Sequence, residues 1–397
     1  MPQRTKPPLS DSLQQLIGRP VAAIDTPALV IDLDAMQRNL VRMAEFAHKH
    51  GMRWRAHAKM HKSVAIARLQ LQAGANGICV QKTSEAEAMA EGGVHQLYIS
   101  NEVVAAHKLA RVARLAHRLA AESGQLAIAV DSVEGVTGLA NAMNDARREL
   151  GAMAVIDVYV EVDVGHGRCG VPPGPQAVAL VHQVRKHPAL RFAGLQAYHG
   201  KAQHIRSAHE RRDVIATAAR DAASTKDLIE AAGVRVELIT GAGTGTLVSE
   251  TASGVYGELQ PGSFLFMDAD YAQNERDPAQ PQFEHALFVK TQVMSCGAEH
   301  AVCDAGHKSH AIDSGLPRVA NIDGATHLAY ANGGDEHGVL RAAPGGKLPA
   351  IGTMLWLIPG HCDPTVNLHD VMVGVKGGLV DGVVDKILRV DARGALT

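Results

Sequence analysis

The sequence lacks the features that mark secreted and membrane-spanning chains. It has only five cysteines, an odd number that is widely scattered and without a CxxC pair, which argues against a disulfide framework. No window approaches about 18 uninterrupted apolar residues, and the N-terminus has no apolar stretch that would serve as a signal sequence. We therefore expect reduced thiols and a cytoplasmic location.

The sequence also has no large excess of charge of either sign. The formal net charge is -2, and no block of like charges occurs. The chain thus has no general electrostatic attraction for nucleic acid or for an anionic membrane, and we expect neither as a partner. Any ligand must be recognised locally, by a few well-placed side chains.

What is present is enough apolar sequence for a large core. The 397 residues are 46% hydrophobic, and from Pro27 short apolar runs alternate with Ala-rich segments of helical spacing. We interpret the runs as eight strands, each followed by a helix: residues 28–33, 53–58, 77–81, 96–101, 126–132, 156–165, 192–200 and 235–243. This pattern predicts an α/β fold, a (β/α)8 TIM barrel, with a doubly wound open sheet as the alternative.

The pattern changes after about Asp270. Alternating apolar residues with Gly, Asp and Asn turns then predominate, as in "HALFVKTQVMSC" and "VMVGVKGGLVDGVVDKILRV", which favours a separate antiparallel β domain. We expect a barrel over residues 27–270 and a β domain over residues 271–397, the latter joined by the N-terminal segment 1–26.

Four polar clusters follow predicted barrel strands, where the loops of such barrels assemble active sites. They are "HAK", "EVDVGHGRCG", "QAYHG" and "ITGAGTGT". Each has an ordinary explanation when taken alone. Lys59 could be a solvated cation, but at a barrel mouth its amine can lose solvation and form a Schiff base. Arg168 could be a surface charge, or its guanidinium could approach a ligand between flanking glycines.

The stretch "TGAGTGT" could be a flexible turn or a phosphate-binding loop. Glycines after a late barrel strand let backbone N–H groups approach a phosphate, and hydroxyls of Thr240, Thr244 or Thr246 could add donors. We favour the phosphate interpretation because of the position of this loop after the last predicted strand.

"PGHCDPTVNLHD" raises the question of a metal. If this segment is extended, His361 and Asp363 point to one face and Cys362 to the other. An imidazole and a carboxylate are suitable ligands for Zn, Mn or Mg and leave positions open for water and substrate. A polar turn before Pro364 is the alternative.

Taken together, these motifs resemble a known family. "DTPALVIDL", "HAKMHK", "GICVQKTSEAEA", "EVDVGHGRCGV", "GLQAYHG", "ITGAGTGT", "ELQPGSFLFMDADY" and "HCDPTVNLHD" are similar to the pyridoxal-phosphate-dependent D-threonine and 3-hydroxy-D-aspartate aldolases and the D-serine dehydratase-like enzymes. The resemblance runs from about Asp25 to near the C-terminus. It implies an alanine-racemase-type barrel (PLP fold type III) followed by a β domain.

The resemblance also implies roles for particular residues. Lys59 and His204 would be catalytic, with Lys59 linked to pyridoxal 5'-phosphate and His204 acting on the substrate hydroxyl. The remaining cofactor contacts would be Gln81, Arg168, Tyr198, Thr240, Gly243 and Thr244. A divalent metal (Mn, Mg, Co or Zn) would be bound by His361 and Asp363. We expect Lys62 to be an ordinary surface cation.

Two reactions remain open. Proton removal from a β-hydroxyl would give retro-aldol cleavage of a β-hydroxy D-amino acid to glycine and an aldehyde, whereas loss of the hydroxyl would give a keto acid and ammonia. Dehydratase-like relatives usually have cysteine at the second ligand position, so Asp363 favours the aldolase, although a one-residue shift could exchange it with Cys362.

The substrate and the assembly follow from the resemblance only in outline. Arg55, His307, Lys308 and His310 are candidates to bind a second substrate carboxylate. A non-catalytic cofactor carrier is a further alternative, but such proteins generally lack a second domain. The family expectation is a homodimer.

Overall fold

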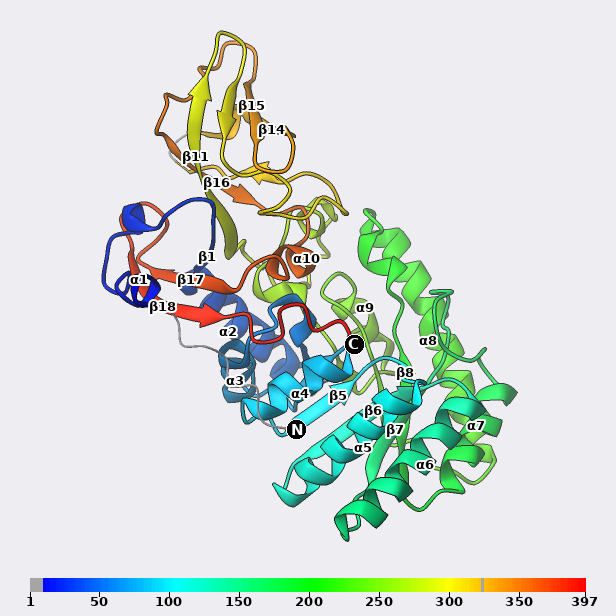
Figure 1. Ribbon diagram of the computed structural model, residues 1–397. Coiled ribbons are helices and arrows are strands. Elements are labelled where there is room, and N and C mark those ends of the chain that lie inside the picture. Colours follow the sequence, from blue (N-terminus) through cyan, green and yellow to red (C-terminus); the bar gives the residue numbers. More distant parts are fainter. Residues whose placement is uncertain (1–9, 323–324) are drawn as a thin grey trace. The chain divides into compact units, whose positions relative to one another are not determined.

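The computed structural model describes residues 10–322 and 325–397, so residues 1–9 of the N-terminal segment lie outside the described part (Figure 1). The chain divides into two compact units. One contains residues up to Asn39 together with Leu265–Ala269 and Phe283–Val390, and the other contains Leu40–Phe264, Asp270–Gln282 and Asp391–Thr397.

The larger unit is a parallel barrel. Its sheet has nine segments, in the order β2 (Arg53–Trp54), β10 (Glu258–Leu259), β9 (Ile239–Gly241), β8 (Leu190–Ala197), β7 (Ile156–Glu161), β6 (Gln125–Val130), β5 (Gln96–Ile99), β4 (Ile78–Val80) and β3 (Ala56–His57). The first and last segments are two halves of one stretch, interrupted at Arg55. The sheet therefore closes on itself, and all carboxyl ends of its strands point to the same mouth.

Helices cover the outside of this barrel. They are α3 (Val64–Gln72), α4 (Thr83–Glu91), α5 (Ala106–Ala121), α6 (Val133–Leu150), α7 (Pro175–Arg185), α8 (Ala208–Ala231) and α9 (Leu247–Ser253). In Figure 1, α5, α6 and α7 lie along the outer side of β5 to β8. Helix α5 shows why: Leu109, Val112, Ala116 and Leu119 recur at three- and four-residue spacing and are all buried.

The barrel interior is closed by large side chains and one ion pair. Tyr98 and Tyr159 pack with Cys79 and Leu238 in the interior cluster. Arg55 is only 7% exposed, and its Nε donates to Glu258 Oε1 at 3.2 Å. Burial lowers the pKa of Arg55, but the neighbouring Glu258 carboxylate raises it by a larger amount. The net pKa lies above the ordinary value, so Arg55 remains charged. The candidate role of Arg55 as a substrate contact is wrong, because its guanidinium is used inside the barrel.

The smaller unit is built around a mostly antiparallel sheet. Its main path runs β14 (Leu328–Asn332), β15 (Gly338–Ala342), β12 (Ala301–Cys303), β11 (Leu287–Cys296), β1 (Ala28–Asp32), β17 (Val371–Lys376) and β18 (Val383–Arg389), while β16 (Met354–Ile358) pairs with β11 and with β13 (Arg318–Val319). The short helices α1 (Asp11–Gln14) and α10 (Cys362–Val366) belong to the same unit, and α2 (Leu33–Lys49) begins in it. Its core contains Phe288 and Trp356, whose rings meet edge to face at 6.3 Å.

The first predicted barrel strand does not belong to the barrel. β1 pairs antiparallel with β11 and parallel with β17, and it is buried at Leu29, Val30 and Ile31. A run of apolar residues indicates a buried strand but not the sheet that it joins. The remaining barrel position is filled by β10, a two-residue segment that the sequence did not reveal.

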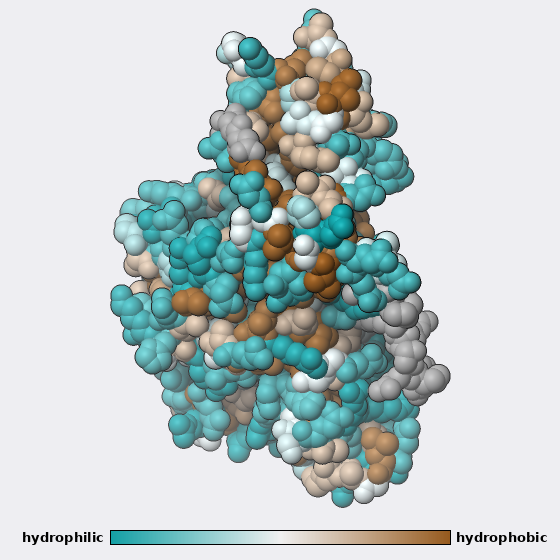
Figure 2. All heavy atoms as spheres, turned by 90° about the vertical axis from the view of Figure 1, so that its left-hand side faces the viewer, coloured by the Kyte–Doolittle hydropathy of each residue, from teal (hydrophilic) through white to brown (hydrophobic). Residues whose placement is uncertain are grey.

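The face in Figure 2 is mostly hydrophilic, with apolar side chains in small groups. Within the described residues, no helix is both long enough and apolar enough to cross a bilayer.

Candidate active site

Lys59 lies at the carboxyl end of β3, in the short 3-10 helix η2 (Ala58–Met60). His57 ends the strand, and its Nδ1 accepts a hydrogen bond from the Lys59 backbone N–H at 3.3 Å. Gln81, which follows β4, places its side-chain nitrogen 2.9 Å from the other ring nitrogen of His57. Burial, with the charge of Lys59, holds the pKa of His57 well below its ordinary value, so the imidazole is neutral beside the amine.

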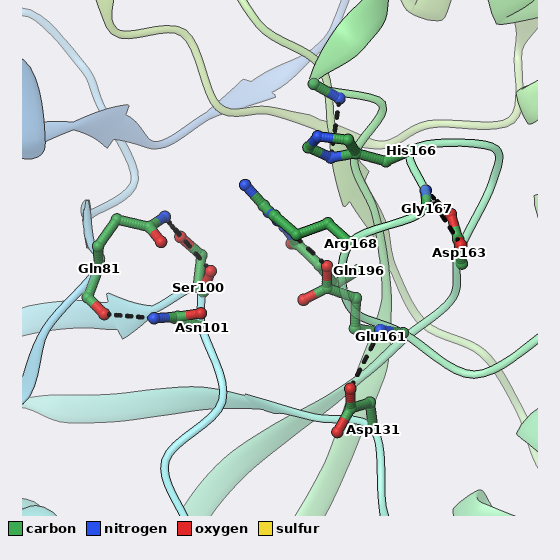
Figure 3. A network of polar contacts seen from close by, with 12 residues as sticks. Gln81, Ser100, Asn101, Asp131, Glu161, Asp163, His166, Gly167, Arg168 and Gln196 are labelled. Atoms are coloured by element: carbon green, nitrogen blue, oxygen red, sulfur yellow. Dashed lines mark hydrogen bonds and ion pairs between the residues drawn. The ribbon is translucent and has the colours of Figure 1, made fainter.

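Arg168 lies in the loop after β7. Its guanidinium is 5.9 Å from the centre of the Tyr198 ring and 3.9 Å from Glu161, the last residue of β7. Figure 3 shows Arg168 extending from this loop toward the side where Gln81 lies. His166, two residues earlier, has a pKa lowered to about 4 by burial and by the charge of Arg168.

The glycine-rich loop follows β9 and is buried. Gly243 and Gly245 pack against Gln203, where a Cβ on Gly243 would meet the Gln203 side chain at 2.4 Å. The Thr244 hydroxyl accepts from the Phe264 backbone N–H at 2.9 Å. Thr240 lies in β9 and donates its hydroxyl to Glu258 at 2.9 Å inside the barrel. The structure thus brings Thr244 and the glycines to the mouth and turns the Thr240 hydroxyl into the barrel interior.

His204 ends the 3-10 helix η3 (Lys201–His204), which follows β8. Its Nδ1 lies 2.6 Å from Asp270 Oδ2, and Arg206 bonds to the other oxygen of the same carboxylate. The His204 side chain is 47% exposed whereas that of Asp270 is 8% exposed. Burial raises the pKa of Asp270, but its bonds to Arg206 and His204 lower it more, so Asp270 is ionised. The His204 Nε2 is therefore the nitrogen available for proton transfer.

His361 and Asp363 come together in the smaller unit, although not on a strand. His361 is the N-cap of α10 and Asp363 lies in its first turn, with 3.7 Å between His361 Nε2 and Asp363 Oδ1. The expectation of extended backbone was wrong, because the helix begins at Cys362. Cys362 is fully buried, with its thiol toward the Met267 carbonyl. Its exchange with Asp363 is thus excluded by the packing.

A second carboxylate orients the imidazole of His361. Asp313 Oδ2 is 2.7 Å from His361 Nδ1, an arrangement typical of metal-binding histidines. Burial lowers the pKa of His361, but the charges of Asp363, Asp313 and Asp268 together raise it above its ordinary value. The same carboxylates would favour a divalent cation at Nε2, so these residues fit the metal.

The barrel mouth fits an anionic cofactor for a similar reason. Lys59 and Arg168 place two positive charges after the ends of β3 and β7, beside His57 and His166. An amine for covalent attachment, an aromatic ring beside a guanidinium and a buried glycine loop complete the set of groups that pyridoxal phosphate requires.

Several other candidates have different surroundings from those expected. Lys62 is not a surface cation: it is 6% exposed, and its Nζ lies 3.2 Å from Glu85. In the smaller unit, His310 is fully buried against the Tyr330 hydroxyl at 2.8 Å, and Lys308 pairs with Glu336 at 2.7 Å. These contacts make Lys62 and His310 structural residues. Asp270 lies within the quoted motif "ELQPGSFLFMDADY", but no role was predicted for it or for Asp313, because their histidine partners are distant in the chain.

Two known family models match the chain. Residues 31–270 match the family model of the alanine racemase N-terminal domain, and residues 286–375 match that of a putative serine dehydratase domain.

Individual relatives cover nearly the whole chain. A D-threonine aldolase of Arthrobacter sp. is 45% identical over 95% of this chain and 95% of its own length, and a 3-hydroxy-D-aspartate aldolase of Paracoccus denitrificans (strain Pd 1222) is 41% identical over 93% of each. The crystal structure of D-threonine aldolase from Filomicrobium marinum superposes with a TM-score of 0.89 at 43% identity, covering 96% of this chain and 99% of that one. A D-threo-3-hydroxyaspartate dehydratase of Delftia sp. (strain HT23) is more distant, at 27% identity over 86% of this chain and 92% of its own length.

Proposed function

This chain belongs to the D-threonine aldolase family of alanine-racemase-fold enzymes and is thus an aldehyde-lyase, and from this premise we propose that it cleaves a β-hydroxy D-amino acid to glycine and an aldehyde. The proposed substrate is of the D-threonine or 3-hydroxy-D-aspartate type, after the names of the aldolase relatives. Pyridoxal phosphate would be held at the barrel mouth and a divalent cation (Mn, Mg, Co or Zn) by His361 and Asp363.

Each cofactor-binding residue has a distinct task in this proposal. Lys59 would hold the cofactor covalently, Arg168 and Tyr198 would flank its ring, and Gly243 and Thr244 would hold its phosphate. Gln81 would contact the cofactor from the end of β4. When bound, the cofactor supplies an electron sink for charge that develops at the substrate Cα, and the cation supplies Lewis acidity toward the hydroxyl.

The proton transfers decide between the two reactions. His204, held through Nδ1 by Asp270, presents Nε2 as a base for the β-hydroxyl proton, and loss of that proton leads to cleavage of the Cα–Cβ bond. The Lys59 amine could instead remove the Cα proton, which leads to loss of the hydroxyl. The Asp270–His204 contact is the observation that carries the aldolase proposal, because it supplies an oriented base for the hydroxyl.

Product analysis tests this proposal directly. Purified protein would be incubated with pyridoxal phosphate and Mn and given D-threonine or 3-hydroxy-D-aspartate, with and without EDTA. We expect glycine and an aldehyde in equal amounts, and a rate that falls by roughly 100-fold on chelation. Formation of ammonia and a keto acid would show that the protein is a dehydratase and not an aldolase. No product from any β-hydroxy D-amino acid would point to the cofactor carrier.

Asp270→Asn gives a second prediction. The variant keeps the size of the side chain but removes the charge that holds His204, so we expect kcat to fall roughly 10- to 100-fold with little change in KM. Steady-state measurements of kcat and KM would check this. Asp277→Asn is the matched control, since Asp277 pairs with the half-exposed Arg212 in the same unit, away from His204. Equal rates for both variants would contradict the role of Asp270.

A further inference from the structure

Two glutamates at the barrel mouth have no place in the mechanism above. Glu161 is the last residue of β7 and is 3% exposed, and Glu102 follows β5. The buried oxygens Glu102 Oε1, Glu102 Oε2 and Glu161 Oε2 receive no N–H or O–H donor from the described residues. A buried carboxylate without a donor is costly, so this arrangement needs a proton or a cation between the two groups.

Other charged groups face the same place. Arg168 lies 3.9 Å from Glu161. Asp131, after β6, accepts from the Gly170 backbone N–H at 3.1 Å, and the ligand atoms of Glu102, Asp131 and Cys169 lie within 4.8 Å of one another. Three ionised carboxylates would therefore face a single guanidinium. One proton removes the excess repulsion, as in other carboxylate pairs that share a site.

A proton suits this cluster better than a metal cation. The Arg168 guanidinium already lies 3.9 Å from Glu161, and it would repel a divalent cation placed between the same carboxylates. Burial, followed by the charge of Glu102, raises the pKa of Glu161 to about 9. The carboxyl pair is thus expected to bind one proton throughout the neutral range.

We propose that Glu102 and Glu161 share one proton, and that this singly charged pair is a positioning element that holds the Arg168 guanidinium beside Tyr198. With one proton, the pair presents one negative charge to one positive charge. With none, the two glutamates repel each other, and with two, Arg168 loses its anionic partner. The shared proton does not depend on the proposed function. The role of Arg168 in binding the cofactor does rest on the proposed function.

Infrared difference spectroscopy tests the proton in the cofactor-free protein. We expect the C=O stretch of a neutral carboxylic acid at about pH 8, disappearing with a midpoint near pH 9 and absent from both Glu161→Gln and Glu102→Gln. Glu250, whose pKa burial raises to about 7, serves as an internal reference with a separate, lower midpoint. Absence of the band in the unaltered protein would overturn the shared proton. So would its loss on addition of Mn, which would indicate a cation instead.

Cofactor binding tests the positioning role. In titrations with pyridoxal phosphate, we expect Glu161→Gln to weaken binding roughly tenfold and to alter the absorption spectrum of the bound cofactor, with partial recovery in Glu161→Asp. Glu87→Gln is the matched control, because Glu87 also pairs with an arginine, Arg111, on the outer helices. If Glu161→Gln and Glu87→Gln behave alike, the positioning role is wrong. If the unaltered protein binds no cofactor, the proposed function fails, while the infrared result still decides the shared proton.

Discussion

Lys59→Ala should eliminate the covalent cofactor link and lower turnover by roughly 10³-fold or more, because no other amine at the end of β3 can take its place. Lys59 follows the strand directly, whereas Lys62 is engaged by Glu85. Borohydride reduction followed by peptide mass spectrometry would locate the modified lysine, and the visible band of the lysine-bound cofactor would report its loss. A variant that retains the link would show that another lysine carries the cofactor.

Lys62→Ala is the control for Lys59→Ala, because it should lower stability and leave the covalent cofactor link intact. It leaves Glu85 buried without its cation, so we expect a loss of roughly 3 kcal/mol in the free energy of unfolding. The covalent link should remain. Urea denaturation and the same mass spectrometry separate the two effects, since Lys59→Ala should change chemistry with little change in stability.

His361→Ala should abolish metal binding and reduce turnover by roughly 10²- to 10³-fold. With only His361 and Asp363 as proposed protein ligands, removal of the imidazole leaves a single carboxylate. Metal content of the dialysed protein, measured by mass spectrometry, should fall from one ion per chain to nearly none, and the residual rate should no longer respond to EDTA. Unchanged metal content would place the cation elsewhere.

Two companion variants show which neighbours matter. Asp313→Asn removes the carboxylate that orients His361 and should weaken metal affinity roughly 10- to 100-fold. Cys362→Ala should leave metal affinity unchanged, because that thiol is buried toward Met267. A large loss of metal affinity in Cys362→Ala would indicate that Cys362 is a metal ligand, and it would favour the dehydratase reaction.

The sequence predicted the barrel well where the signal was local. Apolar runs such as "GICVQ" and "LAIAVDS" became β4 and β6, because a strand buried on both faces is visible from its composition. The sheet that a strand joins depends on distant partners, and β1 was assigned wrongly for that reason. β10, with two residues, is too short to give a pattern.

Site prediction followed the same division. The position of Lys59 and Arg168 near strand ends could be inferred from the sequence, since Lys59 follows β3 closely and Arg168 lies in the loop after β7. Asp270 and Asp313 act on histidines 66 and 48 residues away, and no local pattern announces such pairs. The burial of Lys62 was missed because its partner Glu85 lies in the next helix, α4, and lysine composition alone favours a surface position.

The position of β1 has a consequence for synthesis on the ribosome. The strand is made before both of its neighbours, because it lies between β11 and β17, and its partners there extend to Val375. At about 5–20 residues per second, roughly 20–70 s pass before the second partner has been made. Until then Leu29, Val30 and Ile31 form an apolar strand that lacks at least one of its neighbours, which makes this segment a natural target for chaperones.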